Sequence, residues 1–321
     1  MLRYFIRRLL WACVLFIAVT LVTFVIFFVV PADPARQVCG QRATAECVLR
    51  ARHFLGLDQP MIVQYGRFLD RLVLHQSLGR SFTNRQDVTR QVLNAAPVTA
   101  SLVFGGAVIW LLVSIPVGIL SALRPRSLLD RVTMVGVLVG ISAHPVWIGL
   151  LGAYFLGFRL HLVPITGYCD FFAPTGDCGG PTQWAYHLLL PWCCFAVLYA
   201  ATYVRMIRAY TMETLTEDYV RTARAKGATE TLVLRKHVVR NSLLPVVTIL
   251  GMDLGLALGG AFFTETVFGL PGLGRLAVGA IDNFDLPTVQ GVVVFATVCI
   301  LVFSLLIDTL YAWIDPRIRL T

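Results

Sequence analysis

The chain has 321 residues, of which 57% are hydrophobic and 14% are charged, and its net charge is +9. A mean hydropathy of +0.74 is too high for a domain whose whole surface is wetted, so the composition excludes an ordinary soluble globular protein. The positive charge fits a cytoplasmic bias of basic residues and contact with anionic lipid, and it does not indicate nucleic-acid binding.

Six apolar stretches are long enough to cross a hydrocarbon core of about 30 Å, which takes roughly 20 residues each. They are too long and too continuous for the alternating strands of a barrel, so we expect helices. The first follows Arg3, Arg7 and Arg8 as a signal peptide would, but its apolar run is longer than that of a cleaved signal and predicts a retained helix. The stretches are Leu9–Val30, Val98–Leu123, Val132–Phe158, Leu188–Val204, Leu243–Phe263 and Val289–Ile314.

Residues 31–97, between the first two spans, form the only sizeable polar segment. Apolar residues recur at helical spacing from Val48 to Phe54 and from Ile62 to Leu74, which predicts two helices. The segment is too short to hold a large core of its own. We therefore expect a small helical domain outside the membrane.

The distribution of arginine and lysine predicts the orientation. With the N-terminus inside, the four inside segments carry 3, 3, 8 and 2 basic residues, whereas the short outside loops carry only Arg159 and Arg275. The nine arginines of residues 31–97 count little, because long translocated loops are weak determinants of topology. Both termini are therefore expected in the cytoplasm.

Four of the eight cysteines fall in segments expected outside. Cys39 and Cys47 form one short-range pair, and Cys169 and Cys178 form another, so an oxidising compartment would favour two local disulfides. A zinc site is the alternative, but neither pair has the two-residue spacing or the flanking histidines of a structural site. The other four cysteines lie in apolar spans, where cysteine packs as a small hydrophobic residue.

The longest inside segment runs from Arg205 to Leu244 and is rich in helix-forming residues. The acidic Glu213, Glu217 and Asp218 lie early in it. Arg221, Arg224 and Lys226 lie later, which suits a helix dipole with Gly227 as the stop. A helix, a glycine turn and a second helix are predicted. Composition alone leaves open whether this segment docks on another protein or lies on anionic lipid.

The chain shows no sign of its own catalytic chemistry. It has no phosphate-binding loop of the G-x-x-x-x-G-K-[ST] kind, and no acidic pair indicates hydrolysis. We therefore expect a non-enzymatic chain whose energy source is another subunit. His144 and Pro145, inside the third span, predict a kink with a hydrogen-bonded histidine in preference to a ligand-binding one.

The inside segment resembles a known family. The runs DYVRTARAKG and HVVRNSLLP are similar to the cytoplasmic signature of binding-protein-dependent ABC importer permeases, in the form of the dipeptide and oligopeptide branch. An outside segment directly after the first span resembles the first, "B"-type, permease subunit. Agreement extends over nearly the whole chain, through RYFIRRLL at the start, LGLDQPMIVQY at Leu55–Tyr65, LVPITGY at Leu162–Tyr168, TETVFGLPGLGRL at Thr264–Leu276 and DTLYAWIDPRIR at Asp308–Arg319.

The chain departs from the general family motif, which is Glu-Ala-Ala, three residues, Gly, nine residues and Ile-x-Leu-Pro. Arg221 stands in place of the glutamate, and Arg240 stands in place of the proline. No role can therefore rest on that glutamate's charge, whereas the docking role is kept.

The resemblance implies an all-α membrane protein with six transmembrane helices of the type I ABC importer permease fold and a small periplasmic helical domain between helices 1 and 2. It implies import of di- or oligopeptides across the bacterial inner membrane, driven by ATP hydrolysis in separate subunits. The expected division is 1–30 for the N-terminus and first helix, 31–97 for the periplasmic insertion, 98–314 for the core with a coupling loop at 205–242, and 315–321 for the cytoplasmic tail.

The resemblance also implies partners. They are a second homologous permease subunit in a heterodimer, one or two ATPase subunits that bind ATP and Mg²⁺, a periplasmic or lipid-anchored peptide-binding protein, and membrane lipid. This chain itself is expected to bind no cofactor. The residues expected to dock on the ATPase are Asp218, Tyr219, Arg221, Thr222, Ala223, Lys226 and Gly227.

A translocation path or outer gate is expected near the fifth span. Charge within a span is costly, so Asp253 should face the bundle interior or the path, where it would meet a peptide's amino group or make a structural hydrogen bond. The glycines and proline of Thr264–Leu276 prevent a continuous helix there, although an ordinary outside loop is the alternative. The other path residues expected are Glu265, Phe268, Gly269, Pro271 and Gly272.

Two other functions stay open at this point. A secondary transporter driven by an ion gradient would have several intramembrane charges or paired broken helices, and only Asp253 is central here. Nickel and glutathione importers share the permease fold, and the sequence does not name the substrate.

Overall fold

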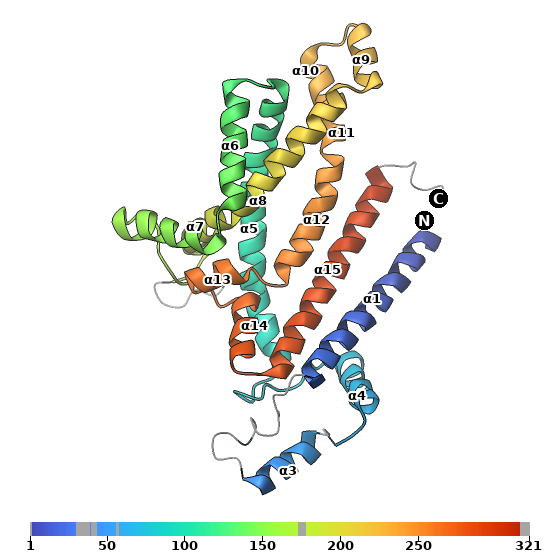
Figure 1. Ribbon diagram of the computed structural model, residues 1–321, viewed down its shortest axis with the longest axis vertical. Coiled ribbons are helices and arrows are strands. Elements are labelled where there is room, and N and C mark those ends of the chain that lie inside the picture. The colour runs from blue at the N-terminus through green and yellow to red at the C-terminus, as the bar shows by residue number, and fades with distance from the viewer. Residues whose placement is uncertain (1, 30–38, 40–43, 56–57, 173–177, 315–321) are drawn as a thin grey trace. The chain divides into compact units, whose positions relative to one another are not determined.

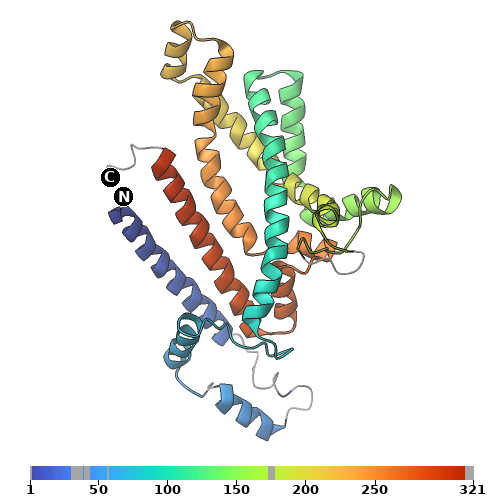
Figure 2. The same ribbon diagram turned by 180° about the vertical axis from the view of Figure 1, so that it is seen from behind.

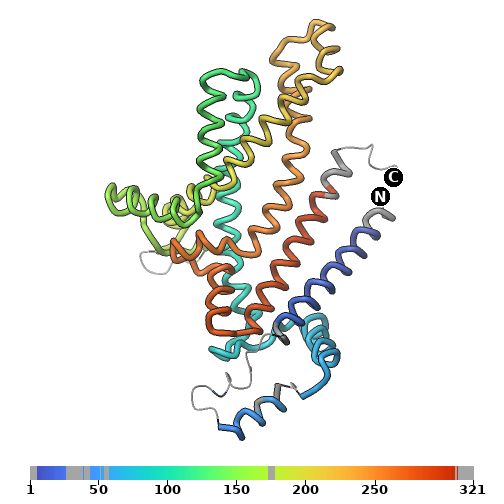
Figure 3. Tube along the Cα trace, in the orientation of Figure 1, coloured from blue at the N-terminus to red at the C-terminus, as the bar shows by residue number. Residues whose placement is uncertain are grey.

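The computed structural model describes residues 2–29, 39, 44–55, 58–172 and 178–314 (Figure 1). Figure 3 follows the Cα trace in the same orientation. The tail 315–321, expected in the cytoplasm, lies outside these residues. Within them the regular elements are helices, with an isolated antiparallel bridge between Arg80 and Asp87. The expected all-α fold is confirmed.

The described helices agree with the expected number of spans. Five are long and apolar enough to cross a membrane, and a strongly bent pair makes a sixth if it counts as one span. The five are α1 (Leu2–Val29), α5 (Val88–Leu123), α8 (Pro181–Leu215), α15 (Leu286–Ile314) and the run Glu230–Leu258, which joins α10 (Glu230–Leu232), η3 (Val233–Val239), α11 (Arg240–Ser242) and α12 (Leu244–Leu258).

Each of these five helices begins before the apolar stretch that predicts it, and the fifth, Glu230–Leu258, ends short of the predicted Phe263. Helices α5 and α8 show the extension most clearly. Helix α5 begins at Val88 rather than Val98 and continues unbroken through Pro97 (Figure 2). Helix α8 extends from Pro181 to Leu215, although its apolar part is only Leu188–Val204. Hydropathy marks the part of a helix that suits lipid, whereas the helix itself continues for as long as its backbone hydrogen bonds do.

The third span is bent where the sequence predicts a kink. Helix α6 (Leu128–Ser142) and the pair α7 (Pro145–Gly152) and η2 (Ala153–Arg159) meet at 103° (Figure 1). His144 is the N-cap residue of α7, and its Nδ1 accepts a hydrogen bond from the Val146 amide at 3.3 Å. Pro145 fits the first turn because its missing N–H would have no partner there. The expected hydrogen-bonded histidine is confirmed, but the span is broken rather than gently kinked.

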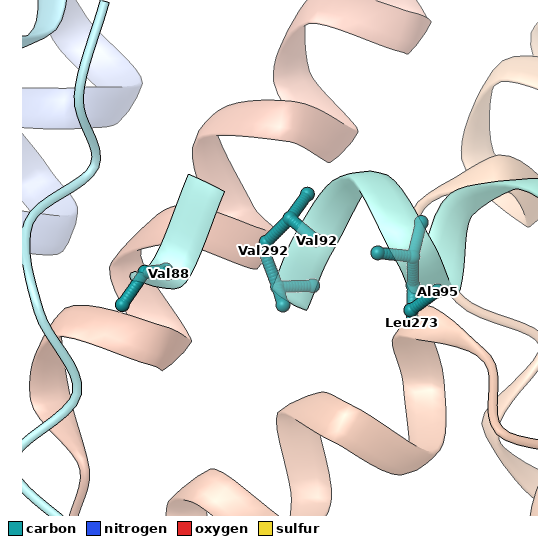
Figure 4. Packing of buried hydrophobic residues seen from close by; sticks show 5 residues of the cluster. All are labelled: Val88, Val92, Ala95, Leu273 and Val292. Atoms are coloured by element: carbon teal, nitrogen blue, oxygen red, sulfur yellow. The ribbon is translucent and has the colours of Figure 1, made fainter. Parts of the chain in front are cut away.

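The chain forms two units. The first takes its described residues from Met1–Thr99, Gly255–Phe262 and Pro271–Thr321. In it, α1 and α14 (Leu273–Asp282) both pack on α15, and α4 (Met61–Val73) packs on α1. Helix α3 (Ala45–Leu55) belongs to the same segment as α4, so both predicted helices of residues 31–97 are present. The start of α5 is buried against α14 and α15 through Val88, Val92, Ala95, Leu273 and Val292 (Figure 4).

Polar contacts fix the ends of these helices. The buried Asp285 carboxylate, just before α15, accepts hydrogen bonds from the Ser81 hydroxyl, from the Phe82 amide at 2.9 Å and from the Thr288 hydroxyl at 2.8 Å. Thr99 Oγ1 accepts from the Leu273 amide at 2.8 Å and so caps the first turn of α14. Residues 81–82 and the start of α5 are thereby tied to the C-terminal helices of the same unit.

The second unit comprises Ala100–Leu254 and Phe263–Leu270. Helix α8 is its centre and packs on α6, α7, η3 and α11. Trp110 of α5 is fully buried and stacks on Tyr199 of α8 with ring centroids 4.6 Å apart. This unit contains the Cys169–Cys178 disulfide, and the first unit contains Cys39–Cys47. Both suggested pairs are thus bonded, and Cys13, Cys193, Cys194 and Cys299 are free.

Close backbone packing in the first unit gives a stability prediction. A Cβ on Gly260, whose φ is +140°, would lie 2.8 Å from Gly274 Cα. Because backbone atoms cannot move aside as a side chain would, Gly260→Ala should lower stability by about 1–3 kcal/mol. The midpoint of thermal unfolding of the purified protein in detergent measures this. Gly279→Ala is the control, because no heavy atom lies within 4 Å of its Cβ; an equal loss in both variants would contradict the prediction.

Candidate coupling and translocation site

The segment after α8 folds into a small lobe, which we call the coupling lobe and define as α9 (Asp218–Ala225) with the following residues 226–242. Val220, Val233 and Val238 are fully buried and form its core, with Leu215 from the end of α8 packed against them. A helix of eight residues is too short to be stable alone, so this core holds α9 in place. The lobe is thereby attached to the end of α8.

Gly227 ends α9 as the sequence predicts. Its φ is +78°, and two hydrogen bonds close the turn, from the Gly227 amide to the Arg224 carbonyl at 2.9 Å and from the Ala228 amide to the Ala223 carbonyl at 3.2 Å. This pair of bonds is the Schellman motif, which needs a left-handed residue at the position of Gly227. No heavy atom lies within 4 Å of a Cβ built there, so the backbone alone selects glycine.

The residues expected to dock are gathered on the outer face of the lobe. Tyr219 is 41% exposed, and its hydroxyl accepts a hydrogen bond from Asn241 Nδ2 at 3.0 Å. Ala223 is half-buried against the valine core. The face therefore presents hydroxyl groups, charges of both signs and a small residue, and it lies over the buried valine core. Its exposed members are Asp218, Tyr219, Arg221, Thr222, Lys226 and Gly227.

Two contacts of the lobe were not expected from the sequence. Arg224 Nε donates to Glu230 Oε1 at 2.7 Å, and this ion pair spans the Gly227 turn. Asn241 holds Tyr219 from the far end of the lobe. A charge pair six residues apart with a glycine turn between its members is a local signal that could have identified the first contact, whereas nothing in the sequence indicates the second.

Asp253 makes a hydrogen bond inside its unit. The Tyr203 hydroxyl donates to Asp253 Oδ2 at 2.7 Å, and Tyr203 is fully buried while Asp253 is half-buried. Tyr203 also contacts Trp110, with ring centroids 5.8 Å apart. One carboxylate oxygen is thus held by an aromatic cluster of α5 and α8, and the carboxylate still reaches the surface of the unit. Tyr203 was not singled out by the sequence.

The residues after the fifth span form two short helices rather than an open loop. Helix α13 (Phe262–Phe268) ends in a second Schellman motif, in which Gly269 has φ +66° and the Leu270 amide donates to the Glu265 carbonyl at 2.8 Å. The expected interruption of the helix is confirmed. Glu265 and Phe268 are buried, and the Phe268 carbonyl accepts from the Gly167 amide at 3.3 Å. Pro271 and Gly272 fall in the other unit from Asp253.

Across the described part of the chain, no group of three or more His, Cys, Asp or Glu side chains is arranged to hold a metal ion. The chemistry at the lobe and at Asp253 is that of hydrogen bonding, charge and aromatic packing.

Comparison with known families covers nearly the whole chain. Residues 114–320 match the model of the binding-protein-dependent transport system inner membrane component. The chain belongs to this family. Residues 1–103 match the corresponding N-terminal membrane-component model, so the polar segment after α1 is part of the family's pattern. The coupling lobe, Asp253 and α13 all lie within the first match.

Relatives of this transport-system membrane component match over their full length. A "Putative peptide transport system permease protein" of Brucella abortus (strain 2308) is 37% identical over 98% of both chains. A "Probable D,D-dipeptide transport system permease protein" of Escherichia coli (strain K12) is 36% identical over 97% of this chain and 96% of its own. A "Dipeptide transport system permease protein" of Alkalihalophilus pseudofirmus is 32% identical over 99% of this chain and 100% of its own.

The Tyr203–Asp253 bond gives a prediction for this membrane component. Tyr203→Phe removes the donor from a carboxylate that stays half-buried, so stability should fall by about 1–3 kcal/mol. Thermal unfolding of the protein in detergent measures the loss. Tyr199→Phe is the matched control, since its hydroxyl has no hydrogen-bond partner among the described residues although its ring stacks on Trp110. Equal loss in the two variants would show that the bond contributes nothing.

Proposed function

We propose that this chain is the first permease subunit of an ATP-binding-cassette importer that moves di- or oligopeptides inward. The full-length match to peptide and dipeptide transport permeases carries the proposal, and the exposed coupling lobe supports it. ATP is hydrolysed by separate subunits, and this chain contributes half of the membrane path beside a second homologous permease. A periplasmic or lipid-anchored binding protein delivers the peptide.

The proposed orientation places both termini and the coupling lobe in the cytoplasm. The distribution of basic residues supports it. When residues 31–97 are left aside, most arginines and lysines fall in the segments predicted to be cytoplasmic. The disulfides support it as well, since Cys39–Cys47 and Cys169–Cys178 both fall in segments placed in the oxidising periplasm. The protein is then a multi-pass component of the bacterial inner membrane.

In this function the outer face of α9 fits a cleft of an ATPase subunit. A docking helix transmits movement only if it is rigid, and the buried core with the closed Gly227 turn supplies that rigidity. ATP-driven closure of the ATPases would then displace the lobe as a body and switch the path between inward-facing and outward-facing states. No bond of the substrate is broken.

The proposed path includes Asp253 and the α13 turn. A half-buried carboxylate in a span must face protein or water rather than acyl chains. We therefore propose that the exposed side of Asp253 faces the path or the second permease. Tyr203 bonds to one oxygen of Asp253, and the other oxygen can accept a hydrogen bond from a peptide's amino group. Glu265, Phe268 and Gly269 are proposed to belong to the outer gate, and the sequence alone proposes the same role for Pro271 and Gly272 of the other unit.

Transport can be tested with the complete complex in proteoliposomes. Uptake of labelled dipeptides should require ATP on the ATPase side together with the binding protein. Uptake that follows an imposed ion gradient without ATP would instead favour a secondary transporter. A competition series with nickel and glutathione tests the other substrates of this permease fold.

Gly227 provides the test of the coupling lobe. Gly227→Val forces a β-branched residue to φ +78°, at a cost of about 1 kcal/mol or more, and should abolish peptide-stimulated ATP hydrolysis and uptake while the chain still inserts in the membrane. Co-purification of the ATPase is measured alongside. Gly227→Asn is the matched control, because asparagine tolerates this conformation and should keep most of the coupling. Wild-type uptake in the valine variant would overturn the assignment.

A further inference from the structure

A carboxylate near the start of α6 gathers four donors from three parts of the second unit. Asp130 Oδ1 accepts from Ser121 Oγ at 2.5 Å and from Arg208 Nε at 2.7 Å. Its Oδ2 accepts from the Arg126 amide and from Arg208 Nη2, both at 2.9 Å. Ser121 belongs to the end of α5, Arg126 to the connection, and Arg208 to α8. One side chain therefore joins three helices.

The burial of this group distinguishes it from an ordinary surface ion pair. The side chains of Asp130 and Arg208 are 7% and 23% exposed, whereas those of Glu230 and Arg224 in the coupling lobe are 72% and 41% exposed. Exposed pairs contribute little, but a buried charge without its partner is strongly unfavourable. The two parallel N–H···O bonds also fix the orientation of the guanidinium, so Arg208 cannot slide along α6 without losing both.

The position of Arg208 connects this group to the coupling lobe. It lies seven residues before the end of α8, and Leu215 at that end packs into the valine core of the lobe. Between them, Thr211 Oγ1 donates to Ser242 Oγ at 3.4 Å, which ties α8 to the last turn of the lobe. Seven residues of helix span about 10 Å. A displacement of the lobe therefore reaches Arg208 through a short, continuous helix.

We infer that Asp130 is a positioning residue for energy coupling: it makes the end of α5, α6 and α8 move as one body when the coupling lobe is displaced. This rests on the proposed function. Without the carboxylate, α8 would shift against α6, and movement of the lobe would be lost before it reached the rest of the unit. The ATPases would still dock and hydrolyse ATP, but hydrolysis would no longer be matched by uptake.

The experiment uses the complete transporter in proteoliposomes and measures the number of ATP molecules hydrolysed for each peptide imported. Asp130→Asn should raise this ratio roughly fivefold or more, while the ATPase still co-purifies. Because Asp130→Asn leaves the half-buried Arg208 without a charge partner, the neutral double variant Asp130→Asn with Arg208→Gln is measured as well. The double variant should insert normally. Its number of ATP molecules hydrolysed per peptide should rise as much as in Asp130→Asn alone, and no further, because both changes remove the same Asp130–Arg208 contact.

Arg131→Gln is the matched control, since it removes a charge from the adjacent, exposed residue of the same helix. Its ratio should equal that of the wild type. A purely structural role of Asp130 would lower uptake and hydrolysis together and leave the ratio unchanged, which would overturn the inference. Failure of the proposed function is distinguishable, because the wild-type complex itself would then show no ATP-dependent peptide uptake.

Discussion

Lipid offers the backbone no hydrogen-bond partner, and this constraint determines how the chain is built wherever a helix stops. At the bend of the third span, the His144 ring supplies the acceptor that the first turn of α7 lacks. At the start of α14, Thr99 supplies it from another helix. At the end of α13, Gly269 folds the chain back so that its own carbonyls are satisfied. Each interruption is therefore a specific arrangement of side chain or glycine that satisfies the backbone where the helix ends.

The same constraint applies to charge, and three of the buried or half-buried carboxylates, Asp285, Asp130 and Asp253, satisfy it differently. Asp285 takes hydroxyl and amide donors around the start of α15. Asp130 takes a guanidinium, a hydroxyl and an amide, and so neutralises its charge within one unit. Asp253 has a single tyrosine and stays partly open. Of these three, Asp253 has the fewest hydrogen-bond donors, and it is the one proposed for the path, where a charged group in a span would find a further partner.

Local features of this protein were predictable from the sequence, and pairings over long distances were not. The spans follow from runs of apolar residues, and the stop at Gly227 and the break at His144 follow from the conformational preferences of those residues. The start of α5 at Val88 was missed because its first turns are polar and Pro97 resembles a boundary. Asp130 and Arg208 are 78 residues apart, and Tyr203 and Asp253 are 50 apart, so no spacing in the sequence indicates either contact.

The bend between α6 and α7 has a consequence for the surrounding bilayer. Helix α6 has 15 residues and so a length of about 22 Å, which is less than the roughly 30 Å of a typical hydrocarbon core. Helix α7 turns away by 103° and exposes Trp147, Leu150 and Leu151, which suits the interfacial zone better than a crossing. A crossing by α6 alone would therefore require the bilayer beside it to thin. In such a bilayer, acyl-chain length would bear on the helix that carries Asp130, through hydrophobic mismatch.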